Sequence, residues 1–396
     1  MPADKNIHVL FLSRWYPHRY DPMPGLFVQR HAEAVALYAK VSLLYVHPDK
    51  QLKNKKHEIF ETEENGVYTI KIYYRNRDYK IPVLNEIIKG WKYFRYNRKG
   101  IRLIEKKKGK ANLLHVNILT RLGIIAYFQK LLSGTPYIIT EHWSRYLPIT
   151  NTYHGKFRKR ITRLLAKKAG AITAVTGNLK NAMQNHGIDN RNFVVVPNVV
   201  DTNKFIPAEK KHTGKKRIVH ISCFEDRSKN ISGIINVIER LSKKRDDFEL
   251  ILVGEGINLD QMKSLSAEKG LTDKTIRFTG LLENQTLIEV LQQADFMLMF
   301  SNYENMPVVI NESFSCGIPV ISSNVGGISE VINPQTGLLV EKGNEKELEE
   351  KINWMLDHHR EFDSHKLREY AIKNFSYEAV GCRFFEIYEK ALQSTR

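Results

Sequence analysis

Residues 296–327 read FMLMFSNYENMPVVINESFSCGIPVISSNVGG and place two short apolar runs on either side of a helical segment. The run FMLMFS, residues 296–301, predicts a buried strand, because continuously apolar strands are typical of sheets covered by helices on both faces. Pro307 then stands where the first residue of a helix belongs, and PVISSN, residues 319–324, predicts the next strand. This order predicts a parallel β–α–β unit.

The same alternation of apolar runs and helical segments extends over almost the whole chain. Each half is therefore expected to form an α/β domain with a doubly wound, Rossmann-like sheet. In the first half the expected strands are residues 7–13, 41–47, 112–118, 137–142, 171–176 and 192–198. In the second half they are residues 217–224, 248–254, 276–280, 296–301 and 319–324.

The domain boundary is predicted at residues 201–216, which are polar, basic and interrupted by Pro and Gly. This linker separates an N-terminal domain, residues 1–200, from a second domain, residues 217–375. Residues 376–396 are expected to form an amphipathic C-terminal helix. Ligands of doubly wound domains bind beyond the carboxyl ends of the strands. Two such domains facing each other would therefore place the site in the cleft between them.

The composition is that of a folded protein with an uneven distribution of charge. Apolar residues make up 42% of 396, the three cysteines lack metal-site spacing, and no run approaches the roughly 18 apolar residues of a membrane span. The N-terminus lacks a leader pattern, so we expect a cytoplasmic location. Residues 1–200 carry 35 Lys and Arg against 13 Asp and Glu, whereas residues 201–396 carry 26 against 30. The basic half predicts an anionic partner, either nucleic acid or a membrane surface.

Two glutamates and two glycines follow the strand 296–301. Glu304 lies in the expected loop and Glu312 in the second turn of the next helix, where carboxylates can accept hydrogen bonds from neighbouring hydroxyls of a sugar or ribose. Taken singly, each glutamate could equally cap a helix or pair with a cation. Gly326 and Gly327 occupy a strand-to-helix turn, which is typical of an anion site. Together these residues favour a nucleotide diphosphate that carries a sugar.

Glu304 and Glu312 resemble the E-x7-E signature of retaining glycosyltransferase family 4, which has the two-domain GT-B fold. The resemblance extends to VVVPNVVDTNKF at 194–205, LILVGEG at 250–256 and the segment 278–340. It implies that Glu312 binds the ribose of the donor nucleotide and that Glu304 binds the donor sugar. Backbone N–H groups near Gly326 and Gly327 would help to hold the donor. Asn305 replaces a common glycine after the first Glu, and Asn tolerates the same left-handed backbone.

Cations are expected in HISCFEDRSKNISG, residues 220–233, to stabilise the departing diphosphate. Lys229 fits the family's lysine, whereas Cys223 stands where the family usually has Arg. Arg227 can supply the missing guanidinium, although a solvated basic loop is the alternative for both cations. No D-x-D sequence occurs to hold a divalent ion. We therefore expect a metal-independent enzyme without a cofactor, for which the nucleotide sugar is a co-substrate.

The first half contributes two further candidates through the resemblance. Gly25 stands where the family has a glycine-rich loop that approaches the donor phosphates. His142 follows the strand YIITE, at the position where the family has a histidine close to the donor sugar. With Glu304 and Lys229, His142 completes the set expected to act in catalysis, and Asn305, Pro307 and Arg227 complete the expected donor site.

Basic helical segments predict how the acceptor is reached. Residues 85–110 interleave Trp91, Tyr93, Phe94 and Tyr96 with Lys and Arg, and residues 156–168 are similarly basic. Such helices can lie on anionic membranes, or they can be solvated faces that cover the sheet. No nucleic-acid-binding module accompanies them. We expect a peripheral position on the inner face of the cell membrane and a saccharide or lipid-linked acceptor.

The sequence thus predicts a retaining glycosyltransferase that moves a hexosyl-type sugar from a nucleotide-sugar donor, with UDP favoured, in cell-surface polysaccharide or glycolipid biosynthesis. Retention of configuration comes from the resemblance. The alternatives are a sugar-nucleotide epimerase of the same fold and a non-catalytic protein that binds sugar nucleotides or membranes. By the resemblance the C-terminal helix can cross back to the first domain; alternatively it completes the second.

Overall fold

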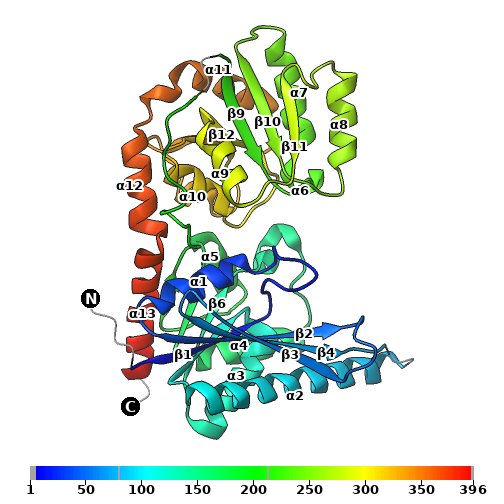
Figure 1. The fold of residues 1–396 in the computed structure, drawn as a ribbon, viewed down its shortest axis with the longest axis vertical. Helices are drawn as coiled ribbons and strands as arrows, with labels where there is room; N and C mark the ends of the chain where they lie inside the picture. Colours follow the sequence, from blue (N-terminus) through cyan, green and yellow to red (C-terminus); the bar gives the residue numbers. More distant parts are fainter. Residues whose placement is uncertain (1–5, 79–80, 212–213, 394–396) are drawn as a thin grey trace. The chain divides into compact units, whose positions relative to one another are not determined.

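The protein is described here from a computed structural model, which covers residues 6–78, 81–211 and 214–393. The chain divides into two compact α/β units, each built on a largely parallel sheet with helices on both faces (Figure 1). This confirms the predicted fold class. Unit 1 consists of Met1–Val175, Leu179–Val199 and Tyr377–Arg396, and unit 2 consists of Thr176–Asn178 and Val200–Ser376.

Unit 1 contains an eight-stranded sheet in the order β3-β4-β2-β1-β5-β6-β7-β8. All neighbouring pairs are parallel except β3 and β4, which form an antiparallel hairpin at one edge. The strands are β1 (His8–Ser13), β2 (Lys40–Asp49), β3 (His57–Glu64), β4 (Val67–Arg75), β5 (Leu113–Asn117), β6 (Tyr137–Glu141), β7 (Ala171–Ala174) and β8 (Phe193–Val195). The helices are α1 (Leu26–Ala36), α2 (Pro82–Lys108), α3 (Leu119–Ser133), α4 (Lys156–Lys168), most of α5 (Gly177–Asn185) and α13 (Tyr377–Gln393).

Unit 2 contains a six-stranded parallel sheet in the order β11-β10-β9-β12-β13-β14. The strands are β9 (Lys216–Ile221), β10 (Phe248–Val253), β11 (Ile276–Gly280), β12 (Phe296–Met299), β13 (Val320–Ser323) and β14 (Gly337–Val340). The helices are α6 (Asp226–Lys229), α7 (Ile231–Ser242), α8 (Leu259–Glu268), α9 (Asn284–Gln292), α10 (Val308–Ser315), α11 (Glu345–His358) and α12 (Ser364–Phe375). In this dinucleotide-fold order the direction of winding reverses between β9 and β12, and ligands of such sheets bind at that reversal.

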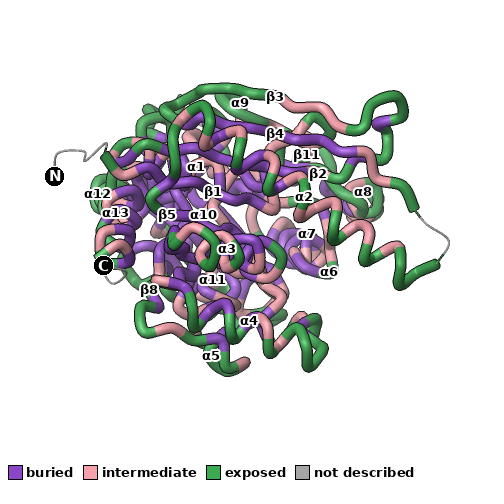
Figure 2. The backbone as a smooth tube through the Cα atoms, turned by 90° about the horizontal axis from the view of Figure 1, so that it is seen from below, coloured by how far each residue is buried: buried purple, intermediate pink, exposed green. Residues whose placement is uncertain are grey.

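The central strands are continuously apolar because each sheet is covered on both faces. In β1, Val9 and Phe11 face one apolar cluster whereas Leu10 and Leu12 face another, and all four side chains are fully buried. Figure 2 shows the same contrast along the chain, with the central strands buried and the hairpin strand β3 largely exposed. Burial of a large apolar side chain stabilises a fold by about 1.5–3 kcal/mol, so these strands hold each unit together.

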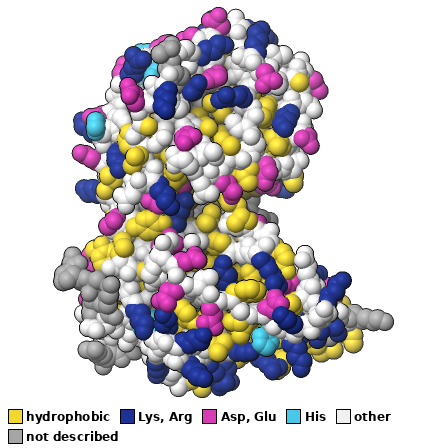
Figure 3. Space-filling model, viewed as in Figure 1, with side chains coloured by type: hydrophobic (Ala, Val, Ile, Leu, Met, Phe, Trp, Pro, Cys, Tyr) yellow, Lys and Arg dark blue, Asp and Glu magenta, His cyan; other side chains and the backbone are white. Residues whose placement is uncertain are grey.

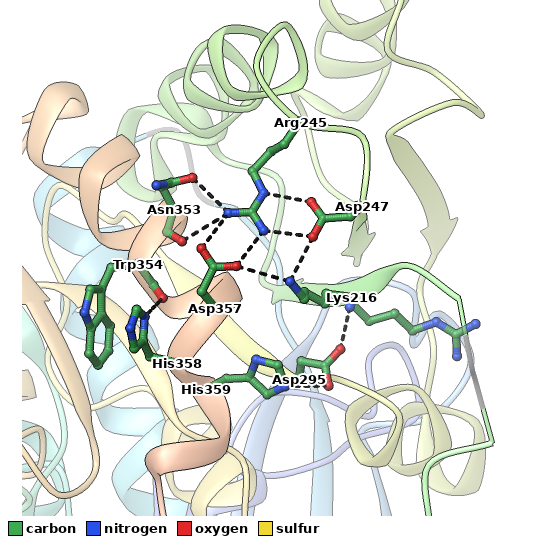
Figure 4. Close-up of polar contacts among 10 residues, drawn as sticks. Lys216, Arg245, Asp247, Asp295, Asn353, Trp354, Asp357, His358 and His359 are labelled. Atoms are coloured by element: carbon green, nitrogen blue, oxygen red, sulfur yellow. Dashed lines mark hydrogen bonds and ion pairs between the residues drawn. The ribbon is translucent and has the colours of Figure 1, made fainter.

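A network of charged side chains closes the amino edge of the unit 2 sheet (Figure 4). Arg245 Nε donates to Asp247 Oδ1 at 2.7 Å and its Nη2 to Asp357 Oδ1 at 2.8 Å, joining the start of β10 to α11. Lys216 Nζ bonds to the same Asp247 at 2.8 Å. Asp295, which is almost fully buried just before β12, accepts from Lys210 Nζ at 2.7 Å. The charges at this edge are thus paired with one another.

Helix α13 packs on α1 within unit 1. The Tyr377 hydroxyl donates to Glu33 Oε2 at 2.9 Å, and the Tyr38 hydroxyl donates to the Glu378 carbonyl at 3.0 Å. Gly381 makes the close approach possible, because a Cβ atom there would overlap the Ala34 carbonyl oxygen. In the described part of the chain every helix is too short or too polar to cross a membrane.

Candidate active site

Three neighbouring strands of unit 2 place the predicted donor residues at one edge of the sheet. Lys229 follows β9, Glu304 follows β12, and Gly326 follows β13. Because these strands are parallel neighbours, their carboxyl ends and the loops beyond them lie together. The loops of β9 and β12 flank the reversal of winding, where ligands of this fold bind.

The loop after β9 is held against β10 by two glycines. A Cβ atom at Gly254 would overlap the Ser222 carbonyl oxygen, and one at Gly256 would lie 2.6 Å from the Phe224 nitrogen. Asp226 then fixes the start of α7, since its Oδ1 accepts from the Ser232 N–H at 2.8 Å and its Oδ2 from the Ser232 hydroxyl at 2.7 Å. Contacts within unit 2 therefore fix the conformation of this loop.

Lys229 and Glu304 form an ion pair across these two loops. Both side chains are largely buried, at 15% and 11% exposed, and Ser301 Oγ donates to the same Glu304 oxygen at 3.0 Å. Burial alone would lower the pKa of Lys229, but the Glu304 carboxylate outweighs it and the pKa is raised. Backbone contacts strengthen the junction, because the Asn302 N–H donates to the Ser228 carbonyl at 2.7 Å. A lysine and a carboxylate are thus preorganised at the ligand edge.

Arg227 and Cys223 both have exposed side chains in the loop after β9. The Arg227 carbonyl accepts from Asn302 Nδ2 at 3.1 Å, so the backbone of Arg227 is fixed while its guanidinium extends into solvent. The structure therefore brings Lys229 to Glu304 but leaves the Arg227 side chain outside that ion pair.

Glu312 lies in the second turn of α10 and its side chain is buried. Helix α10 begins at Val308, so Pro307 is the residue before the helix rather than its first residue, a correction of one position. The extended backbone of Pro307, with ψ at 123°, explains the difference, because helical angles start only after it. Cys316, at the end of the same helix, is also buried, and burial followed by the Glu312 charge raises its pKa to about 12.

Gly326 and Gly327 let their backbone lie close to the backbone of Glu304 and Asn305. Gly326 has a left-handed φ of 60°, and a Cβ atom there would overlap the Glu304 carbonyl oxygen. The Gly327 N–H donates to the Asn305 carbonyl at 2.9 Å. The predicted anion site at a helix start is therefore corrected in one respect: the Gly327 N–H is used within the protein, and only a 3₁₀ turn, Ile328–Glu330, follows. The glycines fix the loop that carries Glu304 and Asn305.

In unit 1, Gly25 and His142 follow β1 and β6. Gly25 has a φ of 77° and precedes α1, where a Cβ atom would overlap the Trp15 carbonyl oxygen. His142 Nε2 lies 3.3 Å from Asn117 Oδ1, and the ring lies 4.4 Å from that of Phe27. Desolvation by this apolar surrounding lowers the pKa of His142 well below its usual value, so the imidazole is neutral at physiological pH.

Glu141, the last residue of β6, orders this strand end. Its Oε1 accepts from the N–H groups of His142 at 3.0 Å and Trp143 at 2.9 Å, and its Oε2 from Leu119 at 3.1 Å. Burial raises the pKa of this carboxyl group. Three backbone bonds to one buried side chain hold the ends of β5 and β6 in place, which fixes the position of His142.

The residues described in the structure contain no group of three or more His, Cys, Asp or Glu side chains arranged to hold a metal ion.

Two doubly wound units, with an E-x7-E pair at the reversal of the second sheet, define a GT-B glycosyltransferase. Residues 39–204 match the family described as Glycosyltransferase Family 4, and residues 201–374 match Glycosyl transferases group 1. The chain belongs to the family-4 glycosyltransferases.

Known proteins are similar to this chain over nearly its whole length. The N-acetyl-alpha-D-glucosaminyl L-malate synthase of Bacillus anthracis is 25% identical over 88% of this chain and 93% of its own length. The sucrose-phosphate synthase of Thermosynechococcus elongatus superposes with a TM-score of 0.74 at 17% identity, covering 98% of this chain and 100% of its own. Anabaena HepE in complex with UDP gives 0.71 at 16% identity, covering 97% and 99%. The two superpositions bear on the fold alone.

Proposed function

We propose that this glycosyltransferase moves a hexosyl group from a UDP-sugar to a saccharide or lipid-linked acceptor, with retention of configuration and without a metal ion. The observation that carries the proposal is the largely buried Lys229–Glu304 ion pair at the reversal of the unit 2 sheet, with the buried Glu312 on the following helix. The choice of UDP is supported by the UDP complex of Anabaena HepE, which shares the fold.

The donor-side roles follow from charge and position. Glu312 accepts hydrogen bonds from the ribose hydroxyls, and Glu304 accepts them from hydroxyls of the sugar. Lys229 faces the phosphate that gains charge as the glycosidic bond breaks, and preorganised cations lower such barriers most when they need no reorientation. Since Glu304 already fixes the ammonium group, Lys229 meets this condition. Arg227 adds a mobile guanidinium from solvent to the same diphosphate.

In the reaction, the bond between the anomeric carbon and the phosphate oxygen breaks while a bond to the acceptor hydroxyl oxygen forms on the same face. The proton of that hydroxyl passes to an oxygen of the departing phosphate. Positive charge develops on the sugar ring during this exchange. The neutral His142 can hydrogen-bond the sugar without repelling that charge, which a protonated imidazole would do.

Nucleotide binding provides the first test of this proposal. With EDTA present, UDP at about 100 times its dissociation constant should stabilise the protein by about 2.7 kcal/mol in a thermal-shift series, whereas GDP and ADP should have smaller effects. Glu312→Gln should weaken UDP binding by about tenfold, because a charged acceptor of the ribose hydroxyls is lost. Glu350→Gln, on the exposed side of α11, is the control and should bind UDP normally. A UDP shift that requires added Mg²⁺ would contradict the metal-independent proposal.

We also propose that unit 1 docks on an anionic membrane to reach its acceptor. Helix α2 exposes Val83 (71%), Ile87 (62%) and Trp91 (57%) at intervals of four residues, which places them on one stripe. Of the four aromatic residues that the sequence analysis named in this helix, Trp91 is exposed on the stripe. The other three, Tyr93, Phe94 and Tyr96, pack against the sheet instead. Lys and Arg side chains gather over the helices of unit 1, with apolar side chains among them (Figure 3). Basic residues near an anionic surface contribute about 1 kcal/mol each.

Liposome co-sedimentation tests the docking. The wild-type protein should bind vesicles rich in phosphatidylserine at low salt, and the double variant Ile87→Ser, Trp91→Ser should lose most of that binding because the apolar stripe is removed. Ile257→Ser is the matched control, since Ile257 is 86% exposed on unit 2. Equal binding by all three proteins, or binding to none of the vesicles, would exclude a membrane role for α2.

A further inference from the structure

Three arginines of unit 1 lie at the carboxyl ends of adjacent strands. Arg14 follows β1 directly, Arg121 lies in the first turn of α3 after β5, and Arg145 lies four residues after β6. Since β1, β5 and β6 are parallel neighbours, these positions share one edge of the sheet. Winding reverses between β1 and β5, which makes this the ligand-binding edge of unit 1 by the same rule as in unit 2.

The ring of Trp143 holds two of these guanidinium groups. The Arg145 guanidinium carbon lies 3.7 Å from the ring centre and that of Arg14 lies 4.9 Å from it. Trp15 contacts Trp143 edge to face at 5.2 Å, so the ring itself is supported. Stacking fixes the planes of the guanidinium groups while leaving their N–H groups available at the edges.

The positive charge of this cluster is not balanced by carboxylates as it is elsewhere in the protein. Glu141 attracts both Arg14 and Arg145, but its oxygens accept three backbone N–H groups and burial raises its pKa. The Arg145 Nε atom is buried, and no described residue offers it an acceptor. Burial, and after it the charge of Arg121, lower the pKa of Arg14.

The amino edge of the unit 2 sheet shows the opposite arrangement. There Arg245 and Lys216 bond to carboxylates within 3 Å (Figure 4). Arg14 and Arg145 are half-buried and lack such partners, which costs folding free energy. Their presence at a ligand-binding edge therefore indicates a ligand that supplies the missing negative charge.

We propose that Arg14, Arg121 and Arg145 form a subsite for an anionic group of the acceptor, a phosphate or a carboxylate. This inference rests on the proposed function, because the acceptor must reach the ligand edge of unit 1. Arg is suited to the task, since its planar fork binds both oxygens of a phosphate or carboxylate at once. A neutral saccharide would leave the charges of the half-buried Arg14 and Arg145 uncompensated.

Calorimetric titration of the full chain, saturated with UDP so that the donor site is filled, tests the subsite. The probes are inorganic pyrophosphate, geranyl diphosphate and glucuronate. Pyrophosphate indicates recognition of the phosphate alone, geranyl diphosphate of a lipid-linked phosphate, and glucuronate of a carboxylate sugar. At least one probe should bind, and Arg145→Gln and Arg14→Gln should each weaken that binding at least tenfold. Failure of all three probes to bind would overturn the proposal.

Two further variants guard against indirect effects. Arg121 is exposed, so Arg121→Gln should leave the fold intact and still weaken the probe about threefold or more. Arg191→Gln removes the same charge next to the amino end of β8, at the opposite edge of the same sheet, and should change affinity less than twofold. If Arg191→Gln and Arg145→Gln lose equal affinity for the probe, binding depends only on the net charge of the protein, and the proposed subsite is overturned. UDP stabilisation measured in the same variants reports on the donor proposal separately.

Discussion

Replacing Lys229 by alanine should lower kcat by about 10²- to 10³-fold, or about 3 kcal/mol in transition-state stabilisation. The lysine is held in place by Glu304 and its pKa is raised, so the ammonium group stays charged at the pH of the assay. Removing it deprives the departing diphosphate of a fixed cation and leaves the largely buried Glu304 carboxylate without a cation beside it. Steady-state transfer rates with saturating donor measure the effect.

A second lysine separates this effect from a general loss of charge. Lys243 pairs with Glu239 on the surface of unit 2, where its side chain is 70% exposed. Exposed pairs of this kind contribute about 1 kcal/mol or less to stability. Lys243→Ala should therefore keep kcat within about twofold of the wild type. If Lys229→Ala retains the same rate as Lys243→Ala, the lysine has no part in the chemistry.

Gly326→Ala should reduce kcat/KM by about 10²-fold and lower the free energy of unfolding. A methyl group at this position overlaps the Glu304 carbonyl oxygen, and backbone on both sides leaves no flexible side chain to move aside. The loop that carries Glu304 must shift, and displacements of about 1 Å at a reacting centre can cost this much in rate. Urea denaturation and donor kinetics on the same protein measure both effects.

Gly343→Ala is the matched control for backbone strain. Gly343 has a φ of 73°, close to the 60° of Gly326, but nothing lies within 4 Å of the added methyl group. Both variants incur the cost of about 1–2 kcal/mol for a left-handed residue with a side chain. Only Gly326→Ala should also lose activity. Equal activity in the two variants would show that the Glu304 loop tolerates displacement.

The sequence is informative wherever an apolar run is long and continuous, because burial on both faces leaves a clear signal. It was less informative for the edge hairpin of unit 1, which was not predicted. Strands β3 and β4 meet at Asn65-Gly66, where both residues have positive φ. An Asn-Gly pair between two strands is a strong short-range hairpin signal. That dipeptide could have revealed the hairpin.

Part of the candidate site can be predicted from the sequence because its two glutamates lie close together along the chain. Glu304 and Glu312 are eight residues apart, so a pattern can carry them. The contact between Lys229 and Glu304 spans 75 residues, and its geometry depends on β9 and β12 being neighbours. The arginines at 14, 121 and 145 have no common motif, and only the strand order brings them to one edge. The Gly326–Gly327 turn resembles a helix-start anion site in sequence, yet only the backbone shows that its N–H group is already used.

The return of α13 to unit 1 has a consequence for biosynthesis. Val380, Phe384 and Tyr388 are fully buried in the same apolar cluster as Val9 and Phe11 of β1. The ribosome makes β1 and α1 first, but α13, which covers this face of the sheet together with α1, is translated only after all of unit 2. Unit 2 is therefore translated in full before unit 1 has all of its chain, and the unit that begins synthesis first is the last to be finished.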